Sequence, residues 1–523
     1  MGRSLFMSGR RRWLAAGLAS SSLAVWPRWL QAGSSVRALR VVGPWEITGL
    51  DPSRAGYLFS RHGVSETLLD IAEDGNPTPA LATHWEVSAD QRHWRFHLRP
   101  QARFHDGSPV TPQAVAAALQ FARRKPGGMG LVPLEAIDAG TDVVDVHLAA
   151  DFAALPAVLA HSSAQILAPA SYSTGGSVRR VIGSGPYQLT GIEPPQRFSL
   201  ARSPHWDGSH PAIAAVDYLA VGRGESRALL AESGQADIVY GLDPASWQRL
   251  KRHARLQVHS VPLPRTIYLK LNAGHRWLAE LPLRQAISLA IDRAGIAHAI
   301  LRDPQAAASQ LLPPALAQWH DADLPAMGQD IAVASQLLAA AGWRPAADGI
   351  RVRQGAKGGE RLALTLRTFP DRPELPIIAA AVQEQLRQVG IAVEVLLGNA
   401  SDVPAAHRQG TLELALGARG YGIYADPMVT LLQDFGPEGG DWGAMNWGNQ
   451  TVPAALAALQ GPLRERDRHA LRRTVTRTLH EELPVIPIAW NLLAAAVHPA
   501  LRGFTLDPLE RSYRLERLSW GEA

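Results

Sequence analysis

The residue patterns that most often mark a catalytic centre are incomplete in this sequence. His480 and Glu481 are the first two residues of a zinc-protease motif, His-Glu-x-x-His, but Pro484 stands where the second histidine belongs. The glycine-rich stretches Gly183–Gly185 and Gly222–Gly224 lack the third glycine of a dinucleotide-binding loop. The sequence also has no phosphate-binding Gly-x-x-x-x-Gly-Lys-Ser/Thr loop and no Gly-x-Ser-x-Gly nucleophile elbow. We therefore expect no catalytic residues and no enzyme; the alternative from another class is an exported peptide hydrolase.

Metal and thiol chemistry is restricted as well. The chain has no cysteine, which excludes disulfides, thiolate metal sites, cysteine nucleophiles and a lipid-anchored cysteine. Its 18 histidines are scattered singly, and a lone histidine is more often a surface or core residue than a metal ligand. We predict no metal site and no cofactor.

The first 38 residues have the order of an export signal. They contain no Asp or Glu, and Arg10–Arg12 precede a weakly apolar stretch, Trp13–Trp26, followed by small residues. The triple arginine followed by Trp13 is typical of a twin-arginine signal, with cleavage expected between Ala32 and Ala38. A flexible or amphipathic N-terminal helix is the alternative. The signal predicts a periplasmic protein without a lipid anchor.

Charge and length limit the kinds of partner and the number of domains that the rest of the chain can have. The whole sequence has 52 basic and 47 acidic residues, and six of the arginines belong to the predicted signal. The mature protein would therefore be close to neutral, which gives no broad electrostatic reason to bind nucleic acid or a membrane surface. No segment after the signal reaches 18 uncharged apolar residues. The remaining length predicts two or three domains.

Strand and helix patterns alternate along the chain, which favours an α/β fold. Proline at the first turn after Thr111 and the glycines at 342 and 390 mark helix ends. Gly355–Gly359 predicts a hairpin or loop. The expected strands lie near residues 94–98, 143–148, 236–240 and 391–395, and the expected helices near residues 111–124, 282–291, 331–341 and 378–389.

Seven segments in sequence order resemble the extracellular solute-binding proteins of family 5, which serve peptide and nickel ABC importers. The most extensive is Leu98–Thr111, where a strand turns at Asp-Gly-x-Pro into a helix. Any one segment is weak alone, but the ordered set is specific. The others are Ala80–Asp90, Gly183–Tyr187, Leu283–Arg293, Leu337–Trp343, Gln385–Ile391 and Pro484–Ile488.

The resemblance implies a two-lobed periplasmic binding protein of type II, close to class C, with a hinge and a ligand cleft between the lobes. Residues 1–38 would be the signal, 39–262 the first lobe with two subdomains, 263–482 the second lobe, and 483–523 the return to the first. Strands near 265–271 and 485–489 would form the hinge. Such a protein is expected to be a monomer that captures a solute by closing and delivers it to an inner-membrane ABC permease.

The loop Gly417–Pro427 resembles the family's ligand loop in the second lobe. In dipeptide-binding relatives this loop carries an Asp that pairs with the peptide ammonium, and the corresponding residue here is Ile423. Nickel-binding relatives share Arg, an aromatic residue, Gly and Asp-Pro with this loop, but their histidine ligand aligns near Gly439 here. Their first-lobe arginine aligns near the neutral Ala164 and Gln165. The resemblance therefore fixes neither ligand.

We expect the ligand to be a small peptide-like or carboxylate-bearing solute, with a nickel or other metal chelate as the alternative. Arg419 would grip a carboxylate, or alternatively form a structural ion pair with a neighbour such as Asp426. The aromatic candidates offer ring faces to the ligand, or alternatively pack in the core. Trp442 and Trp447, in the loop Gly436–Gly448, would cover the cleft or lie on the surface. The predicted ligand-binding residues are Arg419, Tyr421, Tyr424, Trp490, Tyr57 and Arg265.

Overall fold

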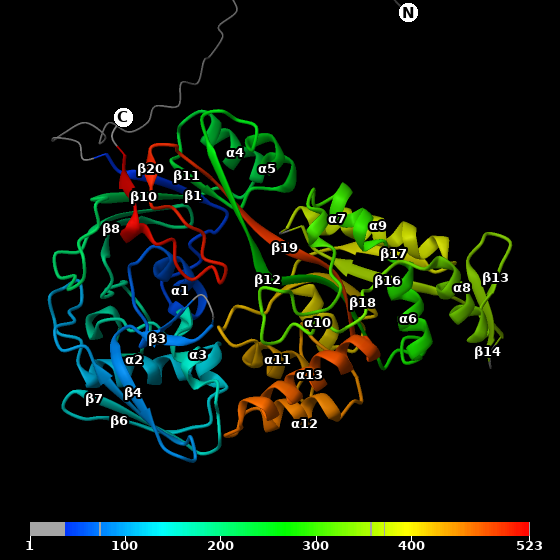
Figure 1. Cartoon of the computed structure of the whole chain (residues 1–523), viewed down its shortest axis with the longest axis horizontal. Helices are drawn as coiled ribbons and strands as arrows, with labels where there is room; N and C mark the ends of the chain where they lie inside the picture. Colours follow the sequence, from blue (N-terminus) through cyan, green and yellow to red (C-terminus); the bar gives the residue numbers. More distant parts are fainter. Residues whose placement is uncertain (1–36, 73–74, 356–357, 371, 522–523) are drawn as a thin grey trace, which may run out of the picture. The chain divides into compact units, whose positions relative to one another are not determined.

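Two long antiparallel strands, β12 (Gln257–Leu271) and β19 (Val485–Val497), lie at the centre of a ten-stranded sheet. The computed structural model describes residues 37–72, 75–355, 358–370 and 372–521. The order across the sheet is β17-β16-β18-β12-β19-β11-β1-β10-β9-β8 (Figure 1). The strands β16–β18 therefore lie on one side of the central pair, and β1 and β8–β11 lie on the other. The remaining strands are β1 (Leu39–Gly43), β8 (Tyr187–Glu193), β9 (Arg197–Arg202), β10 (Ala215–Ala220), β11 (Ile238–Tyr240), β16 (Ala363–Thr368), β17 (Ala392–Leu397) and β18 (Leu414–Gly420).

We use the names lobe 1, for residues 39–262 with 483–523, and lobe 2, for residues 263–482; these boundaries stay predictions. Both central strands are longer than the sequence predicts. Pro262 and Pro264 interrupt the strand pattern of β12, because proline cannot donate a hydrogen bond to a neighbouring strand. The structure accommodates them with a shift in the pairing register between Pro262 and Thr266.

Smaller sheets extend the two lobes. A four-stranded antiparallel sheet in lobe 1 has the order β4-β5-β7-β6, and it packs against α2. Its strands are β4 (Ala82–Val87), β5 (His93–Leu98), β6 (Leu134–Ala139) and β7 (Val143–Leu148). The others are β2 (Leu69–Ile71) with β3 (Pro77–Pro79), β13 (Arg344–Pro345) with β14 (Arg351–Gly355) and β15 (Gly358–Arg361), and β20 (Leu501–Arg502) with β21 (Ser519–Trp520).

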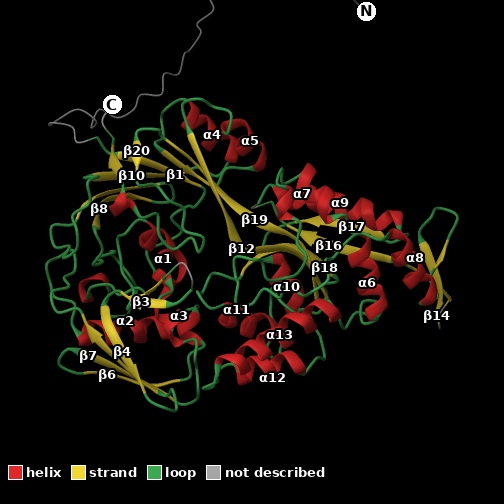
Figure 2. Cartoon of the chain, in the orientation of Figure 1, coloured by secondary structure: helices red, strands yellow, loops and turns green. Residues whose placement is uncertain are grey.

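Helices pack beside the large sheet and on one side of the four-stranded sheet (Figure 2). In lobe 1 they are α1 (Pro52–Arg61), α2 (Pro112–Arg123), α3 (Leu155–Leu159), α4 (Gly224–Glu232) and α5 (Pro244–Leu250). In lobe 2 they are α6 (Leu281–Ala290), α7 (Arg293–Ala299), α8 (Ile331–Ala340), α9 (Glu374–Gln388), α10 (Asp402–Arg408), α11 (Pro427–Phe435), α12 (Thr451–Ala458) and α13 (Glu465–Glu482). Among the described residues, none of the helices combines the length and the apolar character needed to cross a membrane.

The mixed α/β class and most of the predicted elements are confirmed. Thr111 caps α2 with its side chain, and the glycines that follow α8 and α9 have positive φ angles of 87° and 85°. This left-handed conformation ends a helix with least strain when the residue is glycine. The strand expected at 236–240 is shorter, beginning at Ile238. Residues 1–36 of the predicted export signal lie outside the described residues.

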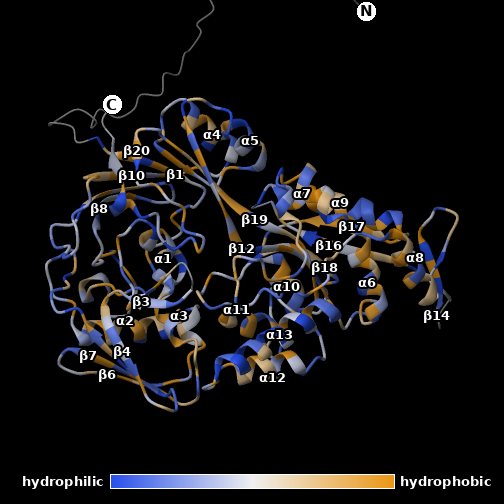
Figure 3. Cartoon of the chain, viewed as in Figure 1, coloured by the Kyte–Doolittle hydropathy of each residue, from blue (hydrophilic) through white to orange (hydrophobic). Residues whose placement is uncertain are grey.

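The hydrophobic core is divided among several clusters, one of which contains residues from both lobes. In that cluster Leu119 and Val146 of lobe 1 belong with Tyr424, Met428 and Leu456 of lobe 2. The backbone N–H of Ala153 also donates to the carbonyl oxygen of Gln460 at 3.1 Å. The lobes are therefore in direct apolar contact. Figure 3 shows the contrast in hydropathy between the strands of the large sheet and the charged helix α13.

The segment Gly183–Tyr187 illustrates why a family motif can be structural. A Cβ atom added at Gly183 would lie 2.8 Å from Ser65 Cα and would collide with the carbonyl oxygen of Val64. The Tyr187 hydroxyl is buried and donates to the carbonyl oxygen of Ile213 at 3.1 Å. The glycine permits the close approach of two backbone segments, and the tyrosine anchors the strand that follows.

Gly183→Ala should lower the free energy of unfolding by about 3 kcal/mol, at the upper end of overpacking costs, because backbone atoms must move to admit the methyl group. Gly191→Ala is the matched control, since its added Cβ atom has no neighbour within 4 Å. Denaturant unfolding of both variants measures the difference. Equal stability of the two variants would contradict the close packing at Gly183.

Candidate functional site

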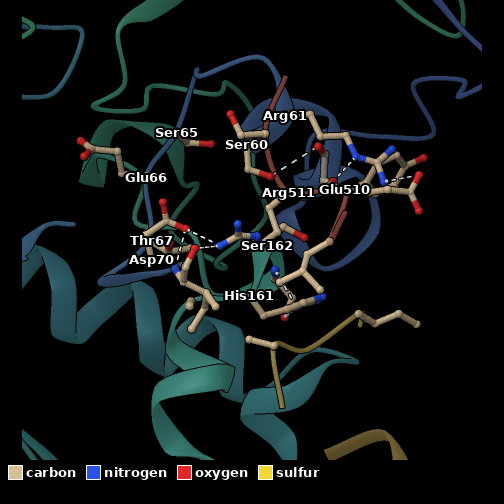
Figure 4. Close-up of a pocket in the computed structure, with 18 of the residues that line it drawn as sticks. Ser60, Arg61, Ser65, Glu66, Thr67, Asp70, His161, Ser162, Glu510 and Arg511 are labelled. Atoms are coloured by element: carbon tan, nitrogen blue, oxygen red, sulfur yellow. Dashed lines mark hydrogen bonds and ion pairs between the residues drawn. The ribbon is translucent and has the colours of Figure 1, made fainter. Parts of the chain in front are cut away.

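A cavity of about 460 Å³ lies where three parts of the chain meet. Lobe 1 contributes the side chains of α1 and of the segment Gly63–Ile71, together with His161–Ser163. Lobe 2 contributes Leu263–Arg265 and the loop that follows β18, and the third part is the C-terminal segment 508–516. Figure 4 shows the labelled side chains of α1, of residues 65–70 and of Glu510 and Arg511 around this space. Residues of both lobes therefore line the cavity.

The local sequence of α1 directs three side chains toward the cavity. Asp51 caps the helix by accepting a hydrogen bond from the backbone N–H of Ser53, and Pro52 occupies the first turn. Tyr57, Ser60 and Arg61 follow at spacings of three and four residues, which share one face of a helix. That face lines the cavity.

The irregularity in β12 brings the central strand to the cavity. Pro262 lies opposite Leu492 and Thr266 opposite Trp490, so three residues of β12, Leu263–Arg265, stand against a single residue of β19. Such a bulge bends the strand and turns its side chains away from the regular pleat. All three residues line the cavity, and the carbonyl oxygen of Pro264 accepts a hydrogen bond from the backbone N–H of Tyr421 at 2.7 Å.

Glu510 lies between two arginines at the centre of the site. Its carboxylate pairs with Arg265 and lies 3.6 Å from the Arg61 Nη2 atom, while its carbonyl oxygen accepts a hydrogen bond from Arg61 Nε at 2.6 Å. Burial acts to raise the pKa of Glu510, but the guanidinium groups of Arg265 and Arg61 outweigh it and leave the pKa below its ordinary value. Glu510 also has a φ of 53°, a conformation unusual for a residue with a Cβ atom.

Arg61 has several contacts, but its hydrogen-bond donors are not all used. Its guanidinium lies 4.3 Å from the ring centre of Trp45 and 5.1 Å from that of Tyr57. Its Nη1 atom is buried and has no hydrogen-bond partner within the described part of the chain. Arg54, exposed at the cavity wall, makes no ion pair with any described residue. Two arginines of lobe 1 therefore keep free capacity to donate.

The carboxylates of the cavity wall are largely engaged. Glu66 pairs with Arg99 at 3.1 Å, and burial raises the pKa of Glu66 against the lowering effect of Arg99. Asp70 accepts from Arg511 Nη1 at 3.1 Å (Figure 4). Glu510 is likewise held by two guanidinium groups. These carboxylates already have partners, so they are not free to pair with a cationic ligand.

Lobe 2 contributes Arg265 as the one charged side chain in its described share of the cavity wall. The remaining lobe 2 residues there are apolar or glycine. Ile423, 46 % exposed, occupies the position at which dipeptide-binding relatives are expected to have an Asp. This part of the wall therefore offers a positive charge and no carboxylate.

Of the predicted ligand-binding residues, the structure brings Tyr57 and Arg265 together at the cavity, whereas Arg419 faces elsewhere. The Arg419 guanidinium binds Asp434 through two parallel hydrogen bonds of 2.7 and 2.8 Å. The two side chains are only 16 % and 2 % exposed. The partner is in α11, eight residues beyond the Asp426 that the sequence suggested. A contact of Arg419 with ligand stays a prediction.

The three aromatic candidates lie behind the cavity wall. Tyr421 is fully buried, and Tyr424 packs its ring 4.5 Å from that of His161 in the other lobe. Trp490 donates from Nε1 to the carbonyl oxygen of Gln310 at 3.1 Å and meets the ring of His320 edge-on. Their direct contact with ligand also stays a prediction.

The two tryptophans of the loop Gly436–Gly448 also lie outside the cavity wall. Trp442 contacts Phe369 edge-on, and Trp447 donates from Nε1 to Glu482 Oε2 at 2.8 Å. Both are half-buried. Their role as a cover over the cleft stays a prediction.

Sequence reasoning missed Arg54, Arg61, Glu510 and Arg511. One sequence signal pointed to Arg61: it is a basic residue in the last turn of an amphipathic helix, where a positive charge is favoured. The C-terminal segment carried none, because its charged residues become part of the site only through tertiary packing.

The described cavity wall offers few side chains that could bind a metal ion directly. His161 is the histidine of the described cavity wall, and its Nδ1 atom lies 2.8 Å from Ser163 Oγ. Burial lowers the pKa of His161 to about 4, which keeps the ring neutral, but the ring packs beneath Tyr424. A metal entering here would be held mainly through the molecule that carries it.

Comparisons with known proteins extend over almost the whole chain. The profile of the Bacterial extracellular solute-binding proteins, family 5 Middle, matches residues 76–442. The chain is 24 % identical over 507 residues to the Nickel-binding periplasmic protein of Escherichia coli (strain K12), with 92 % of this chain and 95 % of the relative covered.

Two further matches represent a second ligand class and a solved structure. The Probable D,D-dipeptide-binding periplasmic protein DdpA of Escherichia coli (strain K12) is 34 % identical over 235 residues, which cover 42 % of this chain and 45 % of that protein. The crystal structure of NikA from Brucella suis in complex with Fe(III)-EDTA matches with a TM-score of 0.83 and 25 % identity, over 92 % of this chain and 100 % of that one. The two-lobed periplasmic-binding-protein fold is thereby confirmed.

Arg419→Met should lower the free energy of unfolding by about 3–5 kcal/mol, because it leaves the buried Asp434 without its charge partner. The control is Arg387→Met, which removes an exposed pair with Glu384 and should change stability little. Denaturant unfolding of ligand-free protein measures both. Loss of ligand affinity without loss of stability would instead indicate that Arg419 serves the ligand.

Proposed function

Because the chain belongs to the bacterial extracellular solute-binding proteins of family 5, we propose that it is the substrate-binding component of an ABC importer, capturing a small carboxylate-bearing solute in the periplasm. Proteins of this family bind solutes without transforming them, so the peptide hydrolase is not retained. The loaded protein would deliver the solute to an inner-membrane permease. The curated relatives named above are periplasmic, and the predicted export signal agrees with that location.

The observation that carries this proposal is the cavity wall supplied by both lobes. A ligand that contacts both lobes stabilises the closed arrangement relative to any open one, by the difference between its interactions in the two. Closure is then the signal that distinguishes loaded from empty protein. The binding event itself needs no catalytic group.

The distribution of free donors supports a carboxylate on the ligand. Arg54 has no ion-pair partner in the described chain, and Arg61 keeps a buried Nη1 atom without an acceptor. Arg265 of lobe 2 also lines the cavity, but its guanidinium is paired with Glu510 and is not counted among the free donors. Guanidinium groups bind carboxylates through parallel charge-assisted hydrogen bonds, so a carboxylate gains most where such donors remain. The acids of the wall, by contrast, already have partners.

A metal chelate is a special case of the same ligand class. The Escherichia coli relative is named as nickel-binding, and the Brucella suis protein was crystallised with Fe(III)-EDTA, whose chelator carries carboxylates. The wall offers His161 as its described histidine, so a chelate would be held here through its carboxylates. Ligand affinity that requires a first-row metal would favour the chelate over a metal-free peptide-like acid.

The proposal is tested by native mass spectrometry of protein purified without refolding, followed by thermal unfolding with the retained compound and its neutral amide or ester. The free acid should raise the melting temperature and the neutral form should not, since only the acid engages the arginines. Arg54→Gln should weaken acid binding by about tenfold, the size of one charge-assisted hydrogen bond. Arg197→Gln, at an exposed arginine of β9, is the control. Equal affinity for acid and amide would exclude the carboxylate.

Ile423→Asp should change the ligand class that the cavity accepts. The new carboxylate would face the cavity from lobe 2 and pair with a free N-terminal ammonium, so dipeptide affinity should rise by about tenfold relative to the unmodified protein. Leu397→Asp, at an exposed residue of β17 outside the cavity wall, is the control for added charge. Calorimetric titration with free and N-acetylated dipeptides measures the effect. Equal gains for both peptides would contradict it.

A further inference from the structure

The four-stranded sheet of lobe 1 carries four histidines on the face opposite its core. On β5, Trp94, Phe96 and Leu98 point into the hydrophobic cluster, so the residues between them point outward. Strand pairing sets His84 opposite His97 and His93 opposite His147. The rings of the first pair are stacked with centres 4.1 Å apart, and those of the second 4.5 Å apart.

A carboxylate converges on the first of these pairs. His84 and Glu86 are two residues apart on β4 and share its outer face, and His97 is the neighbour of His84 on β5. One ligating atom from each of the three side chains lies within 4.8 Å of those of the other two. His84 and Glu86 are exposed, and none of the three lines the cavity between the lobes. The cluster is therefore separate from the solute site.

The local hydrogen bonds leave both imidazoles able to ligate. Thr83 Oγ1 lies 3.2 Å from the carbonyl oxygen of His97, to which it donates its single proton, and 3.0 Å from His84 Nδ1. In the tautomer in which Nδ1 carries the proton, the hydroxyl oxygen accepts from Nδ1–H and the free lone pair of His84 is on Nε2. This arrangement resembles the outer hydrogen bonds that orient histidines at metal centres.

The third donor, the Glu86 carboxylate, lies against His97. His97 Nε2 is covered from solvent and lies 3.5 Å from Glu86 Oε1, without a hydrogen bond among the described residues. Arg95, opposite Glu86 on the neighbouring strand, binds Asp145 at 2.8 Å instead. The Glu86 carboxylate is thus not held by Arg95 and lies beside two imidazoles.

We propose that His84, Glu86 and His97 bind a late first-row divalent cation, such as Zn²⁺, Ni²⁺ or Cu²⁺. Two imidazole nitrogens and one carboxylate oxygen form a donor set that these ions prefer over Mg²⁺ or Ca²⁺. Such an ion would satisfy the covered Nε2 atom of His97 and the exposed carboxylate together. Water would complete the coordination, because the face is open to solvent. The inference rests on this face alone and does not depend on the proposed function.

The second histidine pair provides the internal comparison. His93 Nε2 lies 3.0 Å from Asp145 and His147 Nε2 lies 3.3 Å from Asp138, so each ring is directed to its own carboxylate. Asp145 is also held by Arg95. The two pairs are alike in ring stacking and cross-strand position. They differ because only the first pair has its ligating atoms grouped with those of a carboxylate among the described residues.

The experiment is titration of the untagged full-length protein with Zn²⁺ alone, in competition with a chromophoric indicator. His84→Asn and His97→Asn should each weaken one binding equivalent by about tenfold or more, and Glu86→Gln should weaken the same equivalent. His147→Asn should leave that equivalent within about twofold of the unmodified protein. Copper(II) electron paramagnetic resonance should show two bound nitrogens, reduced to one in each His84 or His97 variant.

Two outcomes would overturn the proposal. One is Zn²⁺ affinity that is unchanged in both the His84 and His97 variants, and the other is the absence of any Zn²⁺ equivalent at micromolar concentrations. Far-ultraviolet circular dichroism of each variant establishes that it is folded before titration. Arg54→Gln should leave Zn²⁺ affinity unchanged while it weakens solute binding, so failure of this proposal and failure of the proposed function are distinguishable.

Discussion

The pairing of β12 with β19 is the constraint on which the rest of the structure depends. Each strand belongs to both halves of the ten-stranded sheet: β12 also pairs with β18 of lobe 2, and β19 also pairs with β11 of lobe 1. The bulge at Leu263–Arg265 falls where the two halves meet, and Arg265 lies opposite Gly420, the start of the lobe 2 loop at the cavity. The cavity is therefore located by strand register rather than by the loops that line it.

Buried ion pairs then decide which charges remain for a ligand. Burying a guanidinium or a carboxylate is costly unless a partner neutralises it, and the fold meets this requirement internally at Glu510 and at Asp434. The pairing at Glu510 also joins α1, the bulge of β12 and the C-terminal segment, three parts that are distant in sequence. Under the proposed function, a solute would meet the remainder: donors of Arg54 and Arg61 that the internal pairs do not use. In such a site, selectivity would depend on the donors that remain unpaired more than on the total number of charged groups.

Local signals in the sequence predicted the elements well, and long-range pairing limited the prediction of the site. Thr111 at a helix start and Gly342 and Gly390 at helix ends act through their own backbone, so their effect is readable from the sequence. Tyr57 and Arg265 were found because the family resemblance placed their segments near the cleft. Arg419 lies in the expected loop, but a buried carboxylate fifteen residues further on binds it, and only tertiary packing brings that carboxylate within reach.

The same limit explains the histidines of the lobe 1 sheet. His84 and Glu86 alternate within one strand, which the sequence displays, but the position of His97 beside them depends on the pairing register of β4 and β5. A shift of one residue would turn His97 to the core face and separate the three donors. The burial of Trp94, Phe96 and Leu98 excludes such a one-residue shift, because all three must point inward.

Apolar contact and charged contact have separate roles in the closed arrangement. Residues of α11 and α12 share a hydrophobic cluster with the helices and strands of lobe 1. If the lobes close around a solute as proposed, part of the free energy of closure comes from apolar burial that is the same for every solute. A ligand then needs to supply only the difference between the open and closed states, and it can do so through a few charged contacts. Because the apolar contribution does not distinguish one solute from another, the proposed function assigns discrimination to the arginines of the wall.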